Sequence, residues 1–134
     1  MIEKLQALHN NSYSPYSKYP VSAIVVTKDG NEFTGVNVEN ASFGATICAE
    51  RVAITSAIAK GYKKGDLKEL YIMAKNNMAT PCFMCRQVIW EFFNPEDIIK
   101  CCSSNGTIKE YKVSELCPYP FGEDDLKWNV VLLV

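Results

Sequence analysis

The sequence contains a single histidine, His9, and this scarcity limits the metal chemistry that the chain can support. A His-Glu-x-x-His zinc site needs two histidines, and a cage of imidazole ligands needs more. Any metal ion bound by this chain must therefore be held mainly by sulfur or by carboxylates. His9 itself lies in an ordinary amphipathic N-terminal stretch, where we expect it to have a structural role.

The chain also has little excess charge and no long apolar run. Fourteen Lys and Arg residues against fifteen Asp and Glu residues give a net charge of -1, so the basic stripe that nucleic-acid binding requires is missing. The longest apolar run, residues 130–134, is far shorter than the ~20 residues of a membrane span, and the N-terminus has no signal-peptide core. We expect a cytoplasmic protein with no nucleic-acid or membrane partner.

Internal repeats, linkers and low-complexity tracts are absent as well. At about 150 residues per domain, the 134 residues correspond to a single domain, residues 1–134. The apolar fraction of 48% and the charged fraction of 22% are those of a globular protein. This composition excludes a disordered tail, a coiled coil and a collagen-like fibre.

Hydrophobic periodicity and turn residues predict an alternation of helices and strands. Asp29-Gly30, between two runs rich in β-branched residues, predicts a hairpin. The expected elements are a helix at 2–10, strands at 21–27 and 31–38, a helix at 47–60, a strand at 70–74, a helix at 82–93, strands at 97–102 and 107–113, a helical turn at 123–127, and either strand or helix at 128–134. A strand-helix-strand-helix-strand run favours parallel pairing, so the predicted class is α/β with a mixed sheet.

The six cysteines have two explanations. A disulfide framework needs an oxidising compartment, and no export signal is visible, so metal binding or catalysis is favoured. Cys82 and Cys85 are i and i+3 on one helix face, and Cys48 adds a third sulfur if the starts of the two central helices meet. Three thiolates suit zinc and leave the fourth position for water, which is typical of a catalytic site.

Charged residues flank this group of cysteines. Glu50 lies two residues beyond Cys48, close enough to exchange a proton with the water without being a ligand. Arg51 and Arg86 stand next to the ligand-bearing segments and can donate hydrogen bonds to the sulfurs. The N-termini of the two helices add partial positive charge.

Other interpretations are compatible with each motif taken alone. A lone Cys-x-x-Cys is equally a redox motif, a structural metal site or a coincidence. We interpret Cys101, Cys102 and Cys117 as buried thiols. A fourth sulfur from one of them would make the site structural and the protein a non-catalytic zinc module. The combination of the motifs favours the catalytic site.

Cys-x-Glu at one helix start and Pro-Cys-x-x-Cys at the next are the signature of zinc deaminases. The sequence resembles the cytidine deaminase family, and specifically its small, Cys-ligated, homotetrameric branch. The likeness covers about residues 13–126 and rests on the segments 15–19, 35–41, 48–51 and 81–87. It implies a cytidine deaminase-like fold, which is a single three-layer domain with a mixed five-stranded sheet flanked by helices.

The resemblance also implies roles for residues around the metal. One zinc ion per chain would be held by three ligands, Cys48, Cys82 and Cys85. Glu50 would act as the proton shuttle. The backbone around Ala49, together with Glu50, would hold the edge of the pyrimidine.

Further substrate contacts follow from the same resemblance. Asn37 and Glu39 match the pair that binds the ribose 3′-hydroxyl, which points to free pyrimidine nucleosides. Tyr19 stands where the family often has Phe, and it keeps the wall of the pocket aromatic. Phe121 matches an aromatic residue that reaches into a neighbouring subunit's site, which implies a homotetramer with shared active sites.

These roles imply hydrolytic deamination of cytidine and deoxycytidine to uridine and deoxyuridine with release of ammonia, a step of pyrimidine salvage. The alternative is a deaminase of a nucleoside antibiotic of the blasticidin S type. Phe83 and Met84 favour that alternative, because they replace the Gly-Ala often found between the paired cysteines and must fit near the metal or a subunit contact. Glu39, as a ribose ligand, argues against it.

Overall fold

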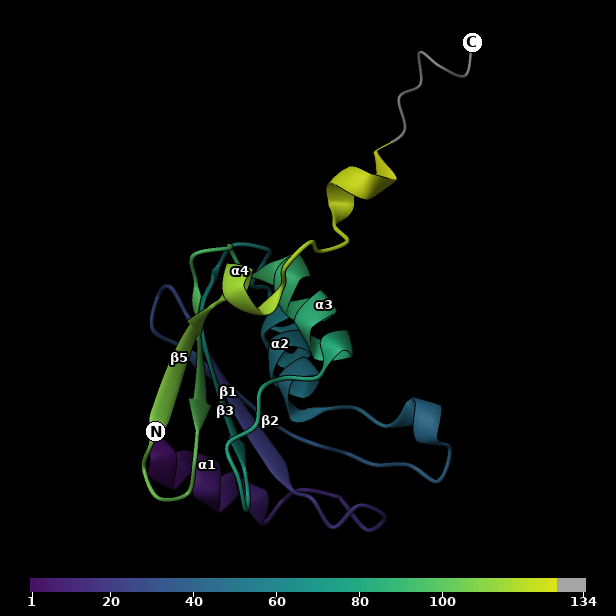
Figure 1. The fold of residues 1–134 in the computed structure, drawn as a ribbon, viewed down its shortest axis with the longest axis vertical. Helices are drawn as coiled ribbons and strands as arrows, with labels where there is room; N and C mark the ends of the chain where they lie inside the picture. The colour runs from purple at the N-terminus through teal and green to yellow at the C-terminus, as the bar shows by residue number, and fades with distance from the viewer. Residues whose placement is uncertain (128–134) are drawn as a thin grey trace.

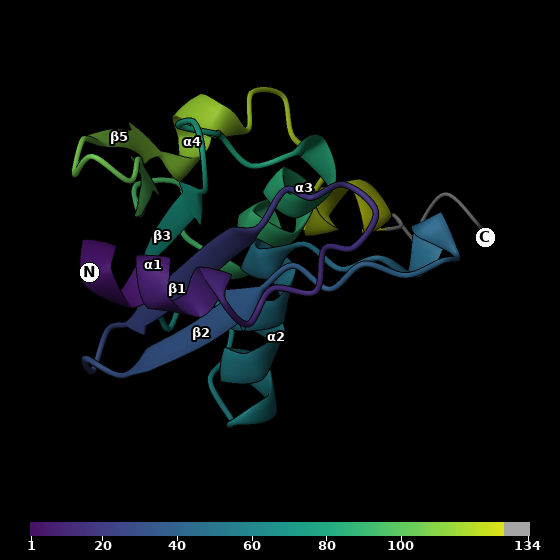
Figure 2. The same cartoon turned by 90° about the horizontal axis from the view of Figure 1, so that it is seen from below.

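A computed structural model of the protein describes residues 1–127 as a five-stranded sheet with helices on both faces (Figure 1, Figure 2). The strands are β1 (Val21–Thr27), β2 (Glu32–Val36), β3 (Leu67–Ala74), β4 (Ile98–Cys102) and β5 (Ile108–Lys112). The helices are α1 (Ile2–His9), α2 (Ala49–Ala59), α3 (Phe83–Phe92) and α4 (Val113–Leu116), with 3-10 turns η1 (Phe43–Ala45) and η2 (Glu123–Leu126). The predicted α/β class is confirmed.

The sheet is mixed, with the strand order β2-β1-β3-β4-β5. The hairpin predicted at Asp29-Gly30 is confirmed, and Gly30 supplies the positive φ of 90° that its turn requires. The two crossover helices behave differently. Helix α3 joins the neighbouring parallel strands β3 and β4, whereas α2 joins β2 to β3 across β1, which the hairpin places between them.

The two faces of the sheet bury separate clusters of apolar side chains. Ala23 and Val25 of β1 face the main core beneath α2 and α3, while Ile24 faces α1 and packs with Leu5. This alternation follows from the two-residue period of a strand. The three layers implied by the family resemblance are therefore present (Figure 2).

Helix α2 lies unusually close to β2, and Gly35 makes this possible. A Cβ atom at Gly35 would lie 2.3 Å from the carbonyl oxygen of Ala49 and 2.6 Å from the backbone nitrogen of Ala53. Only glycine allows the helix backbone to approach the strand so closely. The N-terminus of α2 is set against the sheet as a result.

Element boundaries differ from the prediction at a few positions. The second helix begins at Ala49, because Ile47 instead pairs with Val38 through two backbone hydrogen bonds of 2.9 Å. Strand β3 begins at Leu67, where it continues its pairing with β1. The last strand ends before Val113, which begins α4.

The helical turn predicted near the C-terminal end of the described chain is confirmed as η2, whereas the prediction for residues 128–134 lies outside the described residues. None of the helices described for residues 1–127 has the length and apolar character needed to cross a bilayer.

Candidate active site

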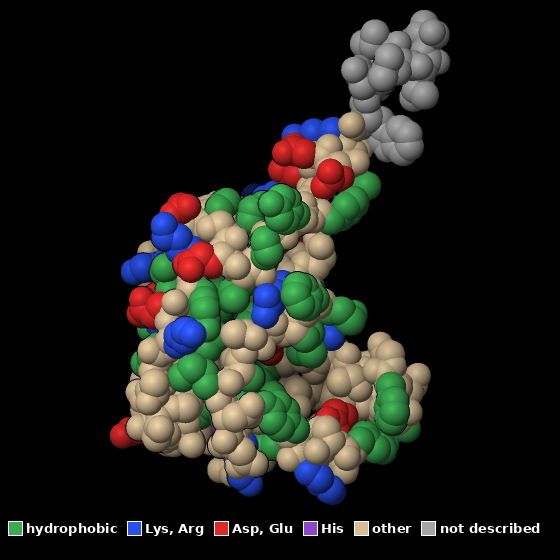
Figure 3. Space-filling view, in the orientation of Figure 1, with side chains coloured by type: hydrophobic (Ala, Val, Ile, Leu, Met, Phe, Trp, Pro, Cys, Tyr) green, Lys and Arg blue, Asp and Glu red, His purple; other side chains and the backbone are tan. Residues whose placement is uncertain are grey.

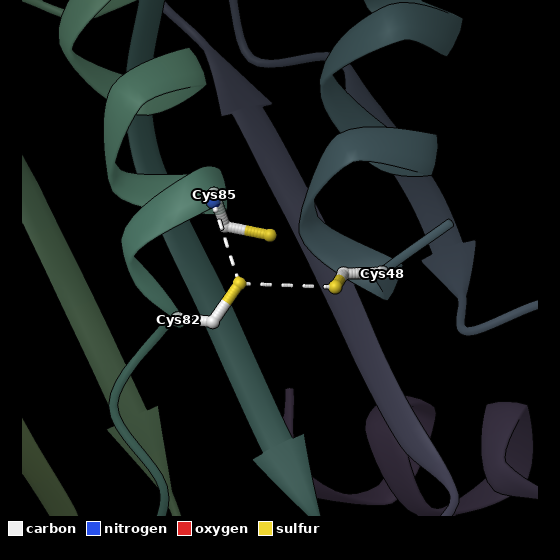
Figure 4. A group of neighbouring side chains, drawn as sticks. All are labelled: Cys48, Cys82 and Cys85. Atoms are coloured by element: carbon white, nitrogen blue, oxygen red, sulfur yellow. Dashed lines mark hydrogen bonds between the residues drawn. The ribbon is translucent and has the colours of Figure 1, made fainter. Parts of the chain in front are cut away.

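Three sulfur atoms meet where the N-termini of α2 and α3 approach each other (Figure 4). Cys48 is the N-cap residue of α2, Cys82 is the N-cap residue of α3, and Cys85 lies in the first turn of α3. The three Sγ atoms lie within 4.8 Å of one another, and those of Cys48 and Cys82 are 3.9 Å apart. The structure thus brings together all three cysteines that the sequence analysis selected.

Local structure explains why these side chains converge. Cys82 caps its helix, since its sulfur accepts a hydrogen bond of 3.5 Å from the backbone nitrogen of Cys85. Unpaired N–H groups give a helix N-terminus a partial positive charge, which stabilises negatively charged sulfur. Two such termini point at one cluster, so the site favours thiolates.

Arg51 adds a full positive charge to the cluster. Its Nη2 donates hydrogen bonds to the sulfur of Cys48 at 3.6 Å and to the carbonyl oxygen of Thr46 at 3.3 Å. Hydrogen bonds from Cys85 and from Arg51 lower the pKa of Cys48 to about 5. The hydrogen bond to Cys48 raises the pKa of Cys85, and its burial acts in the same direction. The surroundings of the cluster therefore favour the thiolate form of Cys48.

This donor set fits a zinc ion. Sulfurs bound to zinc at ~2.3 Å in a tetrahedron lie about 3.8 Å from one another, close to the 3.9 Å between Cys48 and Cys82. Within residues 1–127, the cluster has no fourth sulfur. The other cysteines, Cys101, Cys102 and Cys117, are free and buried elsewhere, as predicted. Three protein ligands are typical of a catalytic zinc site, and the structural zinc module is not supported.

Glu50 lies beside the cluster in the first turn of α2 and is only 5% exposed. Burial is the main cause that raises the pKa of its carboxyl group, and the negative charge of Cys48 adds to the effect. A carboxyl group with a raised pKa holds a proton more readily than an ordinary carboxyl group, which suits it to accept and release one during a reaction. The geometry therefore suits Glu50 to general acid-base chemistry.

A cavity of about 280 Å³ opens over this cluster. Its lining residues are Ser17, Tyr19, Val21, Asn37, Glu39, Thr46, Cys48, Ala49, Glu50, Ile72, Ala79, Thr80 and Cys82. In the space-filling view, the surface is hollowed between the body of the molecule and the projecting segment around η1 (Figure 3). All the predicted metal, proton-transfer and nucleoside contacts except Cys85, Arg51 and Phe121 line this one cavity.

Asn37 is buried, and its side chain is already engaged within the protein. Its Oδ1 accepts hydrogen bonds from the hydroxyl of Ser12 and, at 2.9 Å, from the backbone nitrogen of Val21. Its Nδ2 donates to the carbonyl oxygen of Tyr19 at 2.8 Å. An amide oxygen has two lone pairs, so only one N–H of Asn37 is left for a ligand. Asn37 holds the segment 12–21 in place.

Glu39 is bonded to the same segment, but it keeps unused capacity. Its Oε1 accepts from the backbone nitrogens of Tyr16 at 2.9 Å and Ser17 at 3.1 Å, and its Oε2 accepts from the hydroxyl of Ser17. These hydrogen bonds, the one from the Ser17 hydroxyl most of all, lower the pKa of Glu39. Oε2 can accept a further hydrogen bond, because each carboxylate oxygen accepts about two.

The structure places the bulky residues between the paired cysteines away from the cavity. Phe83 is 75% exposed and Met84 is 66% exposed, and neither lines the cavity. The ring of Phe83 instead stacks on the guanidinium of Arg86, 4.5 Å from its centroid. Of the two places expected for these side chains, near the metal or at a subunit contact, their exposure is compatible with the subunit contact.

The expectation that Arg86 supports the sulfurs is wrong. Its guanidinium donates hydrogen bonds to the carbonyl oxygens of Pro81 at 2.7 Å and Leu116 at 3.1 Å, and to the hydroxyl of Thr80 at 3.1 Å. All of these partners lie outside the cysteine cluster. Arg86 ties the start of α3 to α4 because the fork of its donors matches these oxygens.

Two further predicted positions lie apart from the cavity. Phe121 is 55% exposed and lines a separate groove with Phe83 and Trp90. The Nε2 of His9 and the carbonyl oxygen of Met73 are 2.9 Å apart, so the histidine helps to dock α1 on the sheet, in the expected structural role.

Sequence reasoning missed two residues that shape the cavity. Ser17 belongs to the segment 15–19 that carried the family resemblance, yet no role was assigned to its hydroxyl. Asn77 lies in a polar turn between β3 and α3, and it accepts a hydrogen bond of 2.7 Å from the hydroxyl of Tyr19. Polar residues in loops give no periodic signal, so nothing in the sequence marked Asn77.

The cavity places a cluster of three cysteines and a buried carboxyl group where both can act on the same small molecule. This arrangement is typical of metal-dependent hydrolases of the zinc deaminase class. Comparisons with known proteins identify the family within this class. Residues 1–102 match the family model described as the cytidine and deoxycytidylate deaminase zinc-binding region. The chain belongs to the cytidine deaminase family, whose members are zinc-dependent hydrolytic deaminases.

Individual relatives agree with this assignment. A cytidine deaminase from Mycoplasma genitalium is 35% identical over 116 residues, which cover 87% of this chain and 88% of the relative. A crystal structure of cytidine deaminase from Burkholderia pseudomallei superposes with a TM-score of 0.85 at 37% identity, covering 90% of this chain and 95% of that one. A blasticidin-S deaminase from Bacillus cereus is more distant, at 28% identity over 126 residues, covering 89% and 85%.

Proposed function

We propose that this protein catalyses the hydrolytic deamination of cytidine and deoxycytidine to uridine and deoxyuridine, with release of ammonia, as a step of pyrimidine salvage. The observation that carries the proposal is the shared cavity. Two cysteines of the cluster, the buried Glu50 and the carboxylate of Glu39 all border the same space of about 280 Å³. The membership of the chain in the cytidine deaminase family supports this substrate class.

The metal would be one zinc ion per chain, held by the sulfurs of Cys48, Cys82 and Cys85. When bound there, the ion supplies Lewis acidity, which makes water nucleophilic near neutral pH. Three thiolates oppose that effect by their charge. Arg51 and the two helix N-termini offset part of this charge, so these groups support the reactivity of the site.

Glu50 would move the protons of the reaction. It would take one proton from water and deliver it to the ring nitrogen N3 as the water oxygen bonds to C4. It would then take the second proton from the new hydroxyl at C4 and deliver it to the amino group, which leaves as ammonia when the C4–N bond breaks and the carbonyl forms. Burial raises the pKa of Glu50, so the carboxyl group can carry the proton between these steps. Ala49 begins α2, and the first N–H groups of a helix lack intrahelical partners, so this backbone can hold the edge of the pyrimidine.

Glu39 and Asn37 would bind the sugar. Glu39 is anchored through Oε1, which leaves Oε2 able to accept from the 3′-hydroxyl, and Asn37 has one N–H to donate. No Lys or Arg stands among the described residues that line the cavity. A 5′-phosphate would therefore find no cation on the cavity wall to offset its charge, which favours nucleosides over nucleotides.

The antibiotic alternative has less support than deamination of cytidine. Phe83 and Met84 favoured it, and both side chains lie outside the cavity of their own chain. The blasticidin-S deaminase relative is also less similar to this chain than the cytidine deaminases are. No observation in the described residues favours the antibiotic over cytidine.

The assembly would be a homotetramer with shared active sites in the cytoplasm. Tyr119 is fully exposed and Phe121 is half-exposed, and the groove beside them also contains Phe83 and Trp90. An exposed aromatic cluster of this kind supports contact with another copy of the chain. Phe121 lies outside the cavity of its own chain, which supports a role in a neighbour's site.

The direct test is an assay of ammonia release with cytidine, deoxycytidine, cytosine, cytidine monophosphate, adenosine and blasticidin S. We expect rapid turnover of the first two compounds only. Release from blasticidin S with none from the two nucleosides would replace the proposal by the antibiotic alternative. Equal turnover of cytidine monophosphate would contradict the argument that the cavity wall offers no cation to a 5′-phosphate.

A further inference from the structure

Two loops that are distant in sequence both form parts of the cavity wall. Ser17 and Tyr19 come from the segment between α1 and β1, and Ala79 and Thr80 come from the segment between β3 and α3. Neither segment is a helix or a strand at these positions. The position of each wall therefore depends on individual side-chain contacts.

One hydrogen bond joins the two loops directly. The hydroxyl of Tyr19 donates to Oδ1 of Asn77 at 2.7 Å, across 58 positions of the chain. Among residues 1–127, no other side-chain hydrogen bond connects the segment 11–20 with the segment 75–82. Asn77 is exposed and does not itself line the cavity. Its contact with the cavity is made through Tyr19.

The backbone of Tyr19 is held independently of this bond. Its carbonyl oxygen accepts from Nδ2 of Asn37 at 2.8 Å, and its nitrogen donates to the hydroxyl oxygen of Ser17 at 3.1 Å. The Ser17 hydroxyl in turn donates to Glu39. The residue before Tyr19, Lys18, has a left-handed backbone with φ of 57°, which costs about 1–2 kcal/mol for a residue with a Cβ atom. These contacts hold the loop in that conformation.

With its backbone anchored, the ring of Tyr19 needs only one further contact to be fixed. Asn77 supplies that contact at the far end of the side chain. A phenylalanine at this position would lack the hydroxyl, so its ring would be free to change rotamer. The pair of Tyr19 and Asn77 thus fixes an aromatic wall of the cavity in advance of substrate binding.

We propose that Asn77 is a positioning residue for substrate binding, which acts by holding the ring of Tyr19 against the cavity and by joining its two loop walls. This inference rests on the proposed function for its kinetic consequence. Glu50 and the cysteines are placed by α2 and α3, which this bond does not touch. Loss of the bond therefore raises KM and leaves kcat unchanged.

The test uses both partners of the bond and a neighbouring control. Asn77→Ala and Tyr19→Phe should each raise KM for cytidine about three- to tenfold, which corresponds to about 0.6–1.4 kcal/mol. The double variant should show no further rise, because the same bond is lost. Asn77→Asp should restore KM, since its carboxylate accepts from the tyrosine hydroxyl. Asn76→Ala is the matched control, because the Asn76 side chain makes no hydrogen bond with the described residues.

A second measurement does not depend on turnover. Deuterium uptake by residues 13–20 should be faster in Asn77→Ala and Tyr19→Phe than in the unmodified protein, and unchanged in Asn76→Ala. If the protein does not deaminate cytidine, the proposed function is wrong. Deuterium uptake would still show whether the hydrogen bond between Tyr19 and Asn77 restrains the loop.

Several outcomes would overturn the inference. Multiplicative rises in KM in the double variant would show that the two residues act separately. A fall in kcat, an equal effect of Asn76→Ala, or no rescue by Asn77→Asp would show that Asn77 does not act by positioning Tyr19. Faster exchange with an unchanged KM would mean that the bond restrains the loop without affecting substrate binding.

Discussion

The polar residues of the cavity differ in how much of their hydrogen-bonding capacity the protein already uses. Asn37 has both lone pairs of Oδ1 occupied, whereas Glu39 is anchored through Oε1 and retains capacity at Oε2. The two arginines differ in their hydrogen-bond partners. Arg51 donates to a sulfur, whereas Arg86 donates to carbonyl and hydroxyl oxygens. A residue's chemistry thus depends on which of its donors and acceptors are free.

The first prediction about individual residues concerns the metal content of the cluster. The purified protein should contain one zinc per chain, with three sulfur ligands and one oxygen ligand in X-ray absorption spectra. Cys48→Ala should lose the zinc, and Cys117→Ala should keep it, because Cys117 lies outside the cluster. A shell of four sulfurs would make the site structural and exclude the proposed catalysis.

The second prediction concerns Glu50, which we propose as the proton carrier. Glu50→Gln and Glu50→Ala should keep the zinc and the fold while lowering kcat for cytidine by about 10²–10⁴-fold, since the route for protons is gone. Steady-state ammonia release measures the loss, and zinc analysis with thermal unfolding provides the control. Turnover close to that of the unmodified protein would remove Glu50 from the mechanism.

The third prediction concerns Glu39 and recognition of the sugar. Glu39→Gln should weaken binding of cytidine much more than binding of cytosine, because free cytosine lacks the ribose that Glu39 is expected to contact. Glu96→Gln is the matched control, because it makes the same change at a largely exposed carboxylate outside the cavity. Inhibition constants for both compounds decide the question. Equal losses would show that Glu39 does not bind the ribose.

At the scale of secondary structure, the site is made where two helices begin. Cys48 and Cys82 are the N-cap residues of α2 and α3, so the ends of these helices contribute both clustered sulfurs and partial positive charge. The distance between the helices is set by how closely each packs on the sheet. Gly35 controls this packing for α2, since its missing side chain admits the helix backbone.

Gly35→Ala should therefore disturb both stability and function. The added Cβ would lie 2.3 Å from a backbone oxygen of α2, which cannot turn away as a flexible side chain can. We expect a loss of about 1–3 kcal/mol in the free energy of unfolding, measured by urea denaturation, together with weaker zinc binding. Gly44→Ala is the control, because nothing lies within 4 Å of its added Cβ. Equal stabilities of the two variants would contradict this account of the packing.

At the scale of the whole molecule, the C-terminal part of the described chain stands apart from the three layers. After α4 the chain leaves the body of the domain and carries η2 outward (Figure 1). Gln87 of α3 donates a hydrogen bond of 2.8 Å to the carbonyl oxygen of Phe121, which fixes the start of this segment. The exposed aromatic side chains on it are available to another copy of the chain.

Mixing of subunits tests whether active sites are shared. Chains with Glu50→Ala keep Phe121, and chains with Phe121→Ala keep Glu50. If Phe121 serves a neighbour, co-expressed chains form some sites with both groups intact, and activity rises above that of Phe121→Ala alone. Stacking of its ring on the base would contribute roughly 0.5–1.5 kcal/mol. If the activity of the mixed oligomers equals the weighted average of the activities of the two parent variants, the proposal of shared active sites is refuted.

The sequence by itself determined the features that depend on short spacing. Cys82 and Cys85 share one helix turn, and Glu50 follows Cys48 at the start of the other helix, because helical geometry makes such neighbours regardless of the rest of the fold. The α/β class and the Asp29-Gly30 hairpin were predictable for the same reason. Family motifs then supplied the substrate.

Only the tertiary structure decided how separate segments meet. The approach of α2 to α3 depends on close packing at Gly35, and the choice between Arg51 and Arg86 as a partner of the sulfurs depends on which oxygens lie within reach. The bond from Tyr19 to Asn77 likewise joins two loops that have no periodic pattern. Contacts between distant residues are set by the packing of whole elements, and local spacing carries no information about that packing.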